Sequence, residues 1–166
     1  MILYAKMKER KRAVKTAIYH SPFGDMELSY EKGGVISLRM AEEGTKGEAP
    51  EGLALTVFQE LDEYFQGRRK TFDIPCHTQG TAFQEKVWAA LREIPYGETR
   101  SYRDIAEAIG HPKAYRAVGM ANNANPLFII IPCHRVIGAD GSLTGYGGGL
   151  PMKKALLMLE KKHSIS

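Results

Sequence analysis

The segment from Ile129 to Gly138 brings together groups that packing alone does not explain. Three β-branched isoleucines predict a buried strand, which stops at a proline. The thiol of Cys133, the imidazole of His134 and the guanidinium of Arg135 follow at once. A thiolate is a strong nucleophile, and neighbouring electropositive groups favour its formation. We therefore take Cys133 as the candidate nucleophile.

An extended chain at this point would separate the two reactive groups. On a strand, Cys133 and His134 point to opposite faces, so the imidazole would reach the thiol only through a water or a local bend. A third group is then expected to hold the imidazole in one tautomer. Glu160, on a lysine-rich helix, is the candidate, although a solvated helix residue is the alternative interpretation. Cys76 also precedes a histidine but lacks a following Arg-Val, and we expect no catalysis from it.

Length and composition limit the class of protein. The 166 residues suffice for one large or two small domains, with 43% hydrophobic and 25% charged residues. Two distant cysteines form neither a disulfide framework nor a zinc-ligand pattern, which favours a reduced, cytoplasmic setting and no metal. No segment resembles a signal peptide or a membrane span, so we expect no membrane partner.

The net charge of +4 resides in the C-terminal half. Residues 78–166 contain 11 Lys and Arg against 7 Asp and Glu, whereas residues 1–77 contain 12 of each kind. A basic half is typical of a part that meets polyanions. Residues 1–15 carry six basic side chains against Glu9. A DNA-contacting arm is one interpretation, but we expect a solvated, partly frayed terminus.

The N-terminal half alternates between strand and helix patterns. Residues 17–40 contain alternating apolar positions separated by turns, which predicts a hairpin or meander. Helical periodicity over 53–65 predicts a helix. Residues 72–74 predict one more strand, and residues 75–80 a linker.

The C-terminal half is mainly helical. Thr81 and Ser101 are expected N-caps of two helices, and Pro112 is expected to open a third. The last two, joined through Gly110, are typical of a helix-turn-helix. A glycine-rich loop over 138–149 and a final helix from about Pro151 complete the chain.

The motif Pro132-Cys133-His134-Arg135-Val136 resembles the active-site motif of the O6-alkylguanine-DNA alkyltransferases, the suicidal methyltransferases of DNA repair. The resemblance covers essentially all of 80–160. N-terminal to this, it is limited to the strands, a Pro-Phe-Gly turn and the helix at 53–65. Its landmarks stand in the family's order: Phe83–Trp88, Ile94–Thr99, Ser101-Tyr102, Ala117–Gly119, Asn125-Pro126, Tyr146–Gly149 and Leu156–Glu160.

The resemblance implies an α+β fold in two domains. A small N-terminal α/β domain of the ribonuclease-H-like kind, residues 1–77, precedes a mainly helical domain, residues 78–166, with the helix-turn-helix and the active-site loop. It also implies the activity of a methylated-DNA–protein-cysteine S-methyltransferase. The alkyl group of O6-methylguanine, and also of O4-methylthymine, would move from duplex DNA to Cys133. The expected protein is a monomer that needs no cofactor.

Elementary chemistry agrees with that activity. A methyl group on O6 is buried in stacked DNA, so the base must rotate out of the duplex. Attack on an sp3 carbon requires a soft nucleophile, which a thiolate is. The thioether product contains no bond that an activated water hydrolyses, so each molecule is expected to act once.

The resemblance also implies roles for individual residues. His134 deprotonates Cys133 through a water, Glu160 orients His134, Asn125 braces the active-site segment, and Tyr102 hydrogen-bonds guanine N3 during flipping. Arg116 fills the space that the flipped base leaves in the duplex, which is entered from the minor groove. The catalytic set is Cys133, His134, Glu160, Tyr102 and Asn125; the DNA-contacting set is Arg116, Tyr102, Ala117, Gly119, Tyr115 and Arg135; the base pocket is Val136, Gly147, Tyr146 and Gly148.

Two other classes of protein remain as alternatives. A papain-type hydrolase would use Cys133, His134 and Asn125, but such enzymes bring the thiol and imidazole from distant segments. A lesion-binding or regulatory helix-turn-helix protein would use Arg116 and Tyr102 without chemistry. The cysteine in the motif argues against that class.

Overall fold

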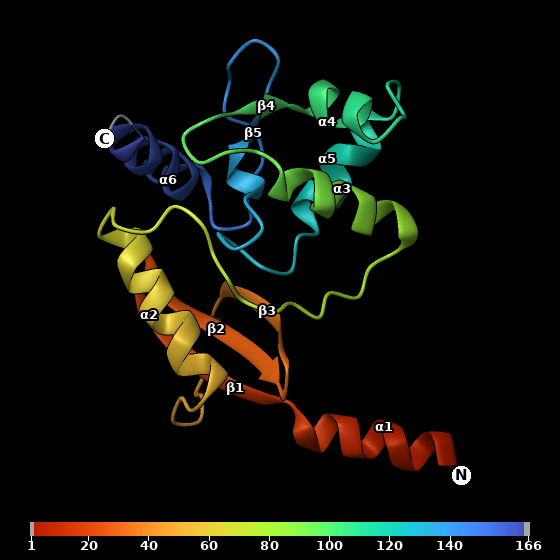
Figure 1. Ribbon diagram of the computed structural model, residues 1–166, viewed down its shortest axis with the longest axis vertical. Helices are drawn as coiled ribbons and strands as arrows, with labels where there is room; N and C mark the ends of the chain where they lie inside the picture. The colour runs from red at the N-terminus through yellow and green to blue at the C-terminus, as the bar shows by residue number, and fades with distance from the viewer. Residues whose placement is uncertain (1, 165–166) are drawn as a thin grey trace.

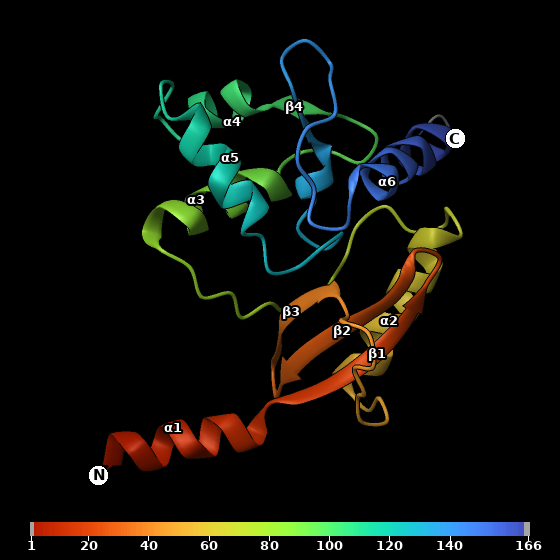
Figure 2. The ribbon, with the colours of Figure 1, turned by 180° about the vertical axis from the view of Figure 1, so that it is seen from behind.

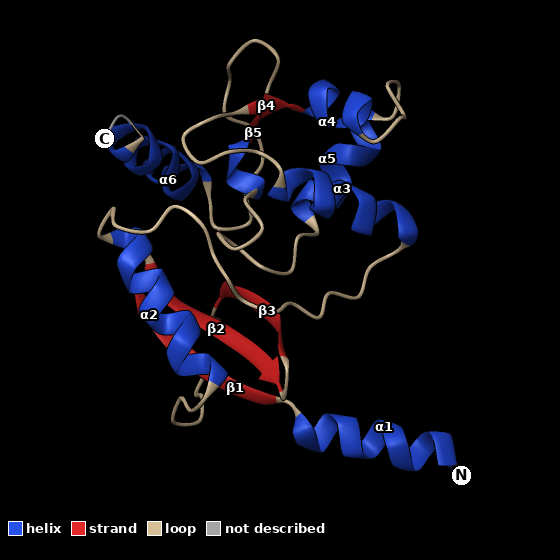
Figure 3. Cartoon of the chain, viewed as in Figure 1, coloured by secondary structure: helices blue, strands red, loops and turns tan. Residues whose placement is uncertain are grey.

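The computed structural model describes residues 2–164, and the side chains of residues 8–12 are outside this description. The chain forms a sheet domain followed by a helical domain (Figures 1 and 3). This is the α+β arrangement that the sequence predicted. The first elements are α1 (Ile2–Ala13), β1 (Lys15–Ser21), β2 (Gly24–Glu31), β3 (Gly34–Met40) and α2 (Leu53–Phe65).

The sheet is an antiparallel meander in the order β1-β2-β3, as the alternating pattern predicted. Alternate residues of β2, among them Met26 and Leu28, are buried on one face. The helix α2 lies across the sheet and buries Val57, Leu61 and Tyr64 (Figures 1 and 2). Its bounds, Leu53–Phe65, are those of the predicted helix, because its apolar residues recur at the helical period.

One prediction for this half held only in part, and another was wrong. The terminus expected to be solvated and partly frayed is solvated, with Ile2 and Leu3 more than 70% exposed, but it forms the helix α1, which projects away from the sheet (Figure 2). The side chains of residues 8–12, on which most of a DNA-contacting arm would depend, lie outside the described part. Residues 72–74 form no strand. Pairing with the sheet comes later, where Val35 donates to Pro75 O and His77 donates to Val35 O, and Pro75 has no N–H to extend it.

The helical domain contains α3 (Ala82–Arg92), α4 (Tyr102–Ala108), α5 (Tyr115–Asn123) and α6 (Leu150–His163), with a short parallel pair of β4 (Arg100–Ser101) and β5 (Val136–Ile137). Thr81 and Ser101 cap α3 and α4, as predicted, and the structure shows that each cap is a capping box. The helix predicted from Pro112 begins only at Tyr115, because a turn from His111 O to Ala114 N precedes it. Within residues 2–164, no helix is long and apolar enough to cross a membrane.

The predicted strand at 129–131 was also wrong. Ile130 N bonds Phe128 O at 2.7 Å and Cys133 N bonds Ile131 O at 2.8 Å, so two γ-turns fold the chain back on itself. Ile129 lies at φ 71°, a left-handed conformation that a β-branched residue rarely adopts. Residues Cys133–Arg135 then form a single 3₁₀ turn, η1.

The Asn125 side chain explains this folded path. Its Nδ2 donates to Ile131 O at 2.8 Å and to Leu127 O at 3.3 Å, and its Oδ1 accepts from Leu127 N at 2.9 Å. The side chain is fully buried. Three local bonds from one amide compete successfully with strand formation, which isoleucine content alone favours.

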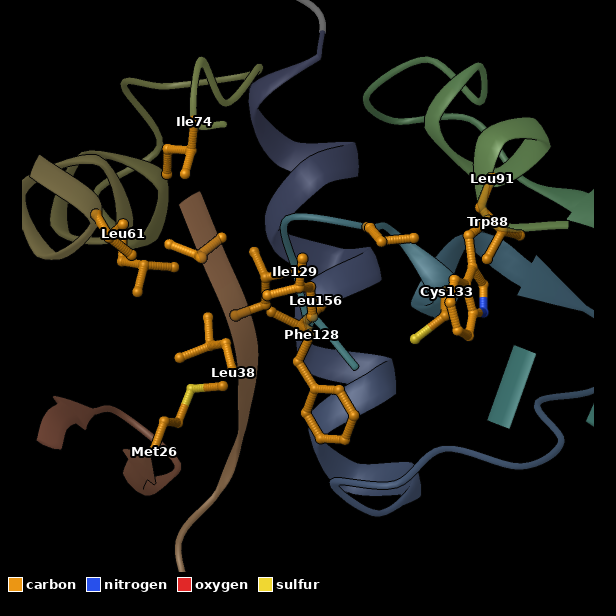
Figure 4. Packing of buried hydrophobic residues seen from close by; sticks show 14 of the residues in the cluster. Met26, Leu38, Leu61, Ile74, Trp88, Leu91, Phe128, Ile129, Cys133 and Leu156 are labelled. Carbon is orange, nitrogen blue, oxygen red and sulfur yellow. The ribbon is translucent and has the colours of Figure 1, made fainter. Parts of the chain in front are cut away.

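The sheet domain fixes the start of the same segment. Leu38 of β3 donates to Pro126 O at 2.8 Å and accepts from Phe128 N at 3.0 Å. Arg39 donates to the carbonyls of Ala124 and Asn125, both at 3.1 Å. Figure 4 shows the apolar part of this contact, where Leu38 lies beside Phe128 and Ile129 within one continuous core. The two domains therefore hold the reactive segment between them.

Replacing Asn125 with alanine tests this brace. The substitution leaves buried backbone groups of Leu127 and Ile131 without their partner, so we expect unfolding free energy to fall by about 2–4 kcal/mol in urea titration. Asn123→Ala, at an exposed position of α5, is the control and should change stability by less than about 0.5 kcal/mol. Equal effects of the two substitutions would contradict the bracing role.

Candidate active site

Cys133 opens the 3₁₀ turn and is 3% exposed. Its carbonyl accepts a bond of 3.4 Å from Asn122 Nδ2. Burial raises the pKa of the Cys133 thiol to about 11, although the nearby Asn125 amide and the Lys153 charge lower it in part. The thiol is therefore protonated at neutral pH, and a base is needed to generate the thiolate.

His134 lies fully buried against Glu160. Its Nε2 is 2.6 Å from Glu160 Oε2. Because an ionised carboxylate only accepts, Nε2 carries the proton and Nδ1 is the basic nitrogen. Nδ1 is buried without a hydrogen-bond partner among residues 2–164. Burial lowers the pKa of His134, an effect that the Glu160 bond opposes, so the imidazole is neutral at pH 7 and able to accept a proton.

The Glu160 carboxylate is fully buried and accepts five hydrogen bonds. Burial alone would raise its pKa, but the bonds from His134 and Arg135 hold it well below its ordinary value. The carboxylate is thus ionised, as an orienting group for the imidazole requires. Its donors are Tyr64 OH (2.6 Å), His134 Nε2 (2.6 Å), Arg135 Nε (2.7 Å), Arg135 Nη2 (3.2 Å) and Gly97 N (3.3 Å).

Arg135 is not placed to contact DNA, contrary to its sequence-based assignment. It is 6% exposed, and its guanidinium forms an ion pair with Glu160 and donates to Ile94 O at 2.7 Å. The sequence showed a basic residue beside the motif but not the direction of its side chain. Arg135 instead provides the counter-ion that keeps Glu160 charged.

Two members of the cluster were missed by the sequence analysis. Tyr64 reaches Glu160 from the sheet domain, 96 residues earlier in the chain, and no local pattern marks it. Lys153 is buried on α6, where its Nζ donates to Val136 O at 2.6 Å and to Thr144 O at 2.7 Å. Its spacing was a usable signal, because Lys153, Leu156 and Glu160 recur at i, i+3 and i+7 on one helix face.

Lys153 connects the thiol to the glycine-rich loop. Burial lowers the pKa of Lys153 to about 8, an effect that Cys133 opposes. A third bond, to Gly145 O at 3.3 Å, ties the ammonium to the loop. The cation therefore lies where it stabilises a thiolate and at the same time fixes loop backbone.

Tyr102, at the first position of α4, meets the same loop. Its OH donates to Thr144 O at 3.1 Å, the oxygen that Lys153 also binds. Gly119 of α5 lies behind the ring, and a Cβ there would be 3.7 Å from it. The phenol thus stands between the helix-turn-helix and the loop.

The expected base-pocket residues lie in close packing around this loop. The Tyr146 ring packs against the Phe128 ring at an interplanar angle of 32°, with ring centroids 5.3 Å apart. A Cβ on Gly147 would lie 2.6 Å from the Phe128 ring, and one on Gly148 would lie 2.5 Å from Met152 Sδ. A larger residue at either position would therefore require the Phe128 or Met152 side chain to shift. Val136 is buried, and its carbonyl is bound by Lys153.

The outer face of α5 carries the remaining expected residues. Tyr115, Arg116 and Ala117 are exposed there, and the Arg103 guanidinium lies 5.8 Å from the Tyr115 ring centroid. Met120, one turn after Arg116, is 75% exposed and was not anticipated. This face is apart from the Glu160 cluster, so the expected site divides into a buried relay and an exposed helix face.

The other cysteine has a different environment. Cys76 lines a cavity of about 250 Å³ between the domains, and burial raises its pKa. Its thiol donates to Ile74 O at 3.3 Å, and the following His77 is paired with Glu31. No base therefore serves Cys76 within the described chain. Nor do residues 2–164 contain a group of three or more His, Cys, Asp or Glu arranged to hold a metal.

Comparison with known proteins agrees with this site. Residues 14–78 match the 6-O-methylguanine DNA methyltransferase, ribonuclease-like domain, and residues 82–162 match the 6-O-methylguanine DNA methyltransferase, DNA binding domain. The fold and the buried cysteine relay thus define a two-domain DNA alkyltransferase. The chain belongs to the 6-O-methylguanine DNA methyltransferase family.

Curated relatives support the same assignment. The methylated-DNA–protein-cysteine methyltransferase of Methanosarcina acetivorans is 49% identical over 150 residues, covering 87% of this chain and 96% of that protein. Its namesake in Mycolicibacterium paratuberculosis is also 49% identical over 150 residues, covering 87% and 90%. The crystal structure of Mycobacterium tuberculosis OGT in complex with DNA superimposes with a TM-score of 0.82 at 47% identity, covering 89% of this chain and 93% of that one.

Replacing Glu160 with glutamine tests the buried cluster. The neutral amide leaves Arg135 without its counter-ion, so we expect a loss of about 3–5 kcal/mol in unfolding free energy near pH 7. The folded pKa of Glu160 is lowered, so its contribution is complete above its unfolded pKa of about 4.3 and declines as pH falls through the folded value. The stability difference between the two proteins should therefore shrink below about pH 4.

The matched control is Glu98→Gln. Glu98 is half exposed and pairs with Arg100 at 3.2 Å in the same domain. Such a surface pair contributes less than about 1 kcal/mol. A Glu160→Gln protein as stable as the Glu98→Gln protein would show that the buried carboxylate is not a structural requirement.

Proposed function

We propose that this chain repairs duplex DNA by moving the alkyl group of O6-alkylguanine to Cys133 Sγ, once per molecule and without a cofactor. The observation that carries the proposal is that the buried Cys133 shares one 3₁₀ turn with His134, whose Nε2 is held by the buried carboxylate of Glu160. A thiol with a raised pKa and an adjacent neutral imidazole is the arrangement that base-assisted thiolate formation requires.

The residues act in a defined order. His134 Nδ1 takes the Cys133 proton through one water, and Glu160 stabilises the resulting imidazolium. The thiolate attacks the O6-alkyl carbon, the new C–S bond forms as the C–O6 bond breaks, and the electron pair of that bond stays on guanine. Tyr102 OH turns its one hydrogen from Thr144 O to guanine N3 and relieves the developing charge. Lys153 stabilises the thiolate electrostatically before attack.

The exposed face of α5 is the proposed DNA-contacting surface. Arg116 would occupy the space of the flipped nucleotide, with Tyr115, Ala117 and Gly119 along the minor groove. The small residues on this helix allow close approach to the phosphates. Similarity to a relative whose crystal structure contains DNA supports this placement. Val136, Tyr146, Gly147 and Gly148 would form the wall that reads the flipped base.

Other parts of the proposal concern organisation. We place the domain boundary at residues 77 and 78, between the Val35–Cys76 bridge and the cap of α3. We also propose a monomer that acts in the cytoplasm and accepts O4-methylthymine as a second substrate. Asn122 and Asn123 stand near the loop and would make part of the pocket wall polar.

Mass spectrometry tests the chemistry directly. Mixed with duplex DNA that contains O6-methylguanine, the protein should gain one methyl group, on Cys133, in proportion to the lesion added. Cys133→Ser should gain none, whereas Cys76→Ser should react like the wild type because Cys76 lacks a base. Repeated turnover, or lesion binding without an adduct, would overturn the proposed reaction.

Arg116→Ala tests base flipping. The substitution removes the side chain that fills the vacated space, so the repair rate in duplex DNA should fall at least tenfold, equivalent to about 1.4 kcal/mol. Reaction with free O6-benzylguanine, which requires no flipping, should change less than twofold. Lys113→Ala, at an exposed position just before the same helix, serves as a control for the loss of one positive charge. Equal losses on duplex and free base would contradict the flipping role.

A further inference from the structure

Tyr64 links the sheet domain to the relay. It lies on α2, is fully buried, and its OH donates to Glu160 Oε2 at 2.6 Å. Glu160 belongs to α6 in the other domain. The sheet domain therefore supplies one of the five donors around the carboxylate that orients His134.

The same carboxylate oxygen serves both side chains. Oε2 accepts from Tyr64 OH and from His134 Nε2, each at 2.6 Å. Each oxygen of a carboxylate offers about two lone-pair directions, so these two short bonds compete for them, together with a longer bond of 3.2 Å from Arg135 Nη2 to the same oxygen. A hydrogen bond to the charged form lowers the basicity of a carboxylate. The phenol thus weakens the pull of Glu160 on the imidazole proton.

We propose that Tyr64 is a positioning residue through which the sheet domain sets the proton affinity of His134, by competing with it for Glu160 Oε2. The inference rests on the proposed function, since it concerns the base of that reaction. The phenol keeps the imidazole neutral enough to accept the Cys133 proton. It also makes the reactivity of the thiol depend on docking of α2 against α6.

The ionisable groups around Tyr64 and His134 determine the pH range in which a change in His134 protonation can be measured. Burial raises the pKa of Tyr64 well above its ordinary value, so the phenol remains a neutral donor. Lys153 has a pKa of about 8 and Cys133 of about 11, so neither titrates between pH 4.5 and 7. The ionisable groups facing His134 and Glu160 are Tyr64 on α2, Tyr96 after α3, Cys133 and Arg135 on η1, Tyr146 in the loop and Lys153 on α6.

Two opposite perturbations of the phenol test the proposal. The rate of Cys133 alkylation by free O6-benzylguanine is measured from pH 4.5 to 7, and the His134 ring nitrogens are titrated by NMR. Tyr64→Phe removes the donor, so Glu160 stabilises the imidazolium more strongly. The acid limb of the pH–rate profile and the midpoint of the His134 titration should both shift upward by about half a pH unit to one unit. Site-specific 3-fluorotyrosine at position 64 is a stronger donor and should shift both downward.

Tyr19→Phe is the matched control. Tyr19 OH donates to the Asp62 carboxylate at 2.8 Å in the same domain, so its removal deletes a comparable bond away from Glu160. This variant should leave the pH profile in place. A uniform loss of rate at every pH in Tyr64→Phe, or shifts of the same sign for both perturbations, would show a purely structural role and overturn the proposal.

Other outcomes remain decisive. If Tyr64→Phe does not fold, the fluorotyrosine protein, which retains the ring, tests the proposal by itself. An acid limb of its pH–rate profile that does not shift would refute the competition for Glu160 Oε2. If the wild-type protein forms no adduct at Cys133 at all, the proposed reaction itself fails. The two failures are therefore distinguishable.

Discussion

The ionised carboxylate of Glu160 is the constraint on which the reactive part of the structure depends. An unpaired charge in this position would be strongly unfavourable, and donors from several parts of the chain satisfy it. The donors come from the sheet domain, the loop after α3 and the 3₁₀ turn. Satisfying one buried carboxylate therefore fixes the relative positions of three separate parts of the chain, and the imidazole is oriented by the same requirement.

A second buried charge organises the opposite side of the thiol. Lys153 binds three backbone carbonyls, of Val136, Thr144 and Gly145, and so ties the strand β5 to the glycine-rich loop. Its ammonium has no carboxylate partner among the bonds in the described structure, which is why burial lowers its pKa. A cation held in this way is a complementary partner for a thiolate. Proton loss from Cys133 thus gives the buried Lys153 ammonium a negative partner, which it lacks while the thiol is protonated.

The local parts of this fold could be predicted from the sequence, and the long-range parts could not. The helix at 53–65 and the caps Thr81 and Ser101 depend on neighbouring residues, and their patterns were sufficient. The isoleucine run failed as a strand because Asn125 folds it back with bonds that no propensity describes. Arg135 was misassigned and Tyr64 was missed for one common reason, since a sequence does not state which distant group a side chain faces.

A buried and rigid relay also suits a thiol that is used once. A network in which each donor has a fixed partner is costly to rearrange. In the proposed reaction the alkyl group remains on sulfur as a thioether, and only the repaired base leaves. The relay therefore needs the reactive geometry in only one state, the protein before alkyl transfer. That requirement is compatible with the γ-turns and the left-handed isoleucine that hold the reactive segment in one conformation.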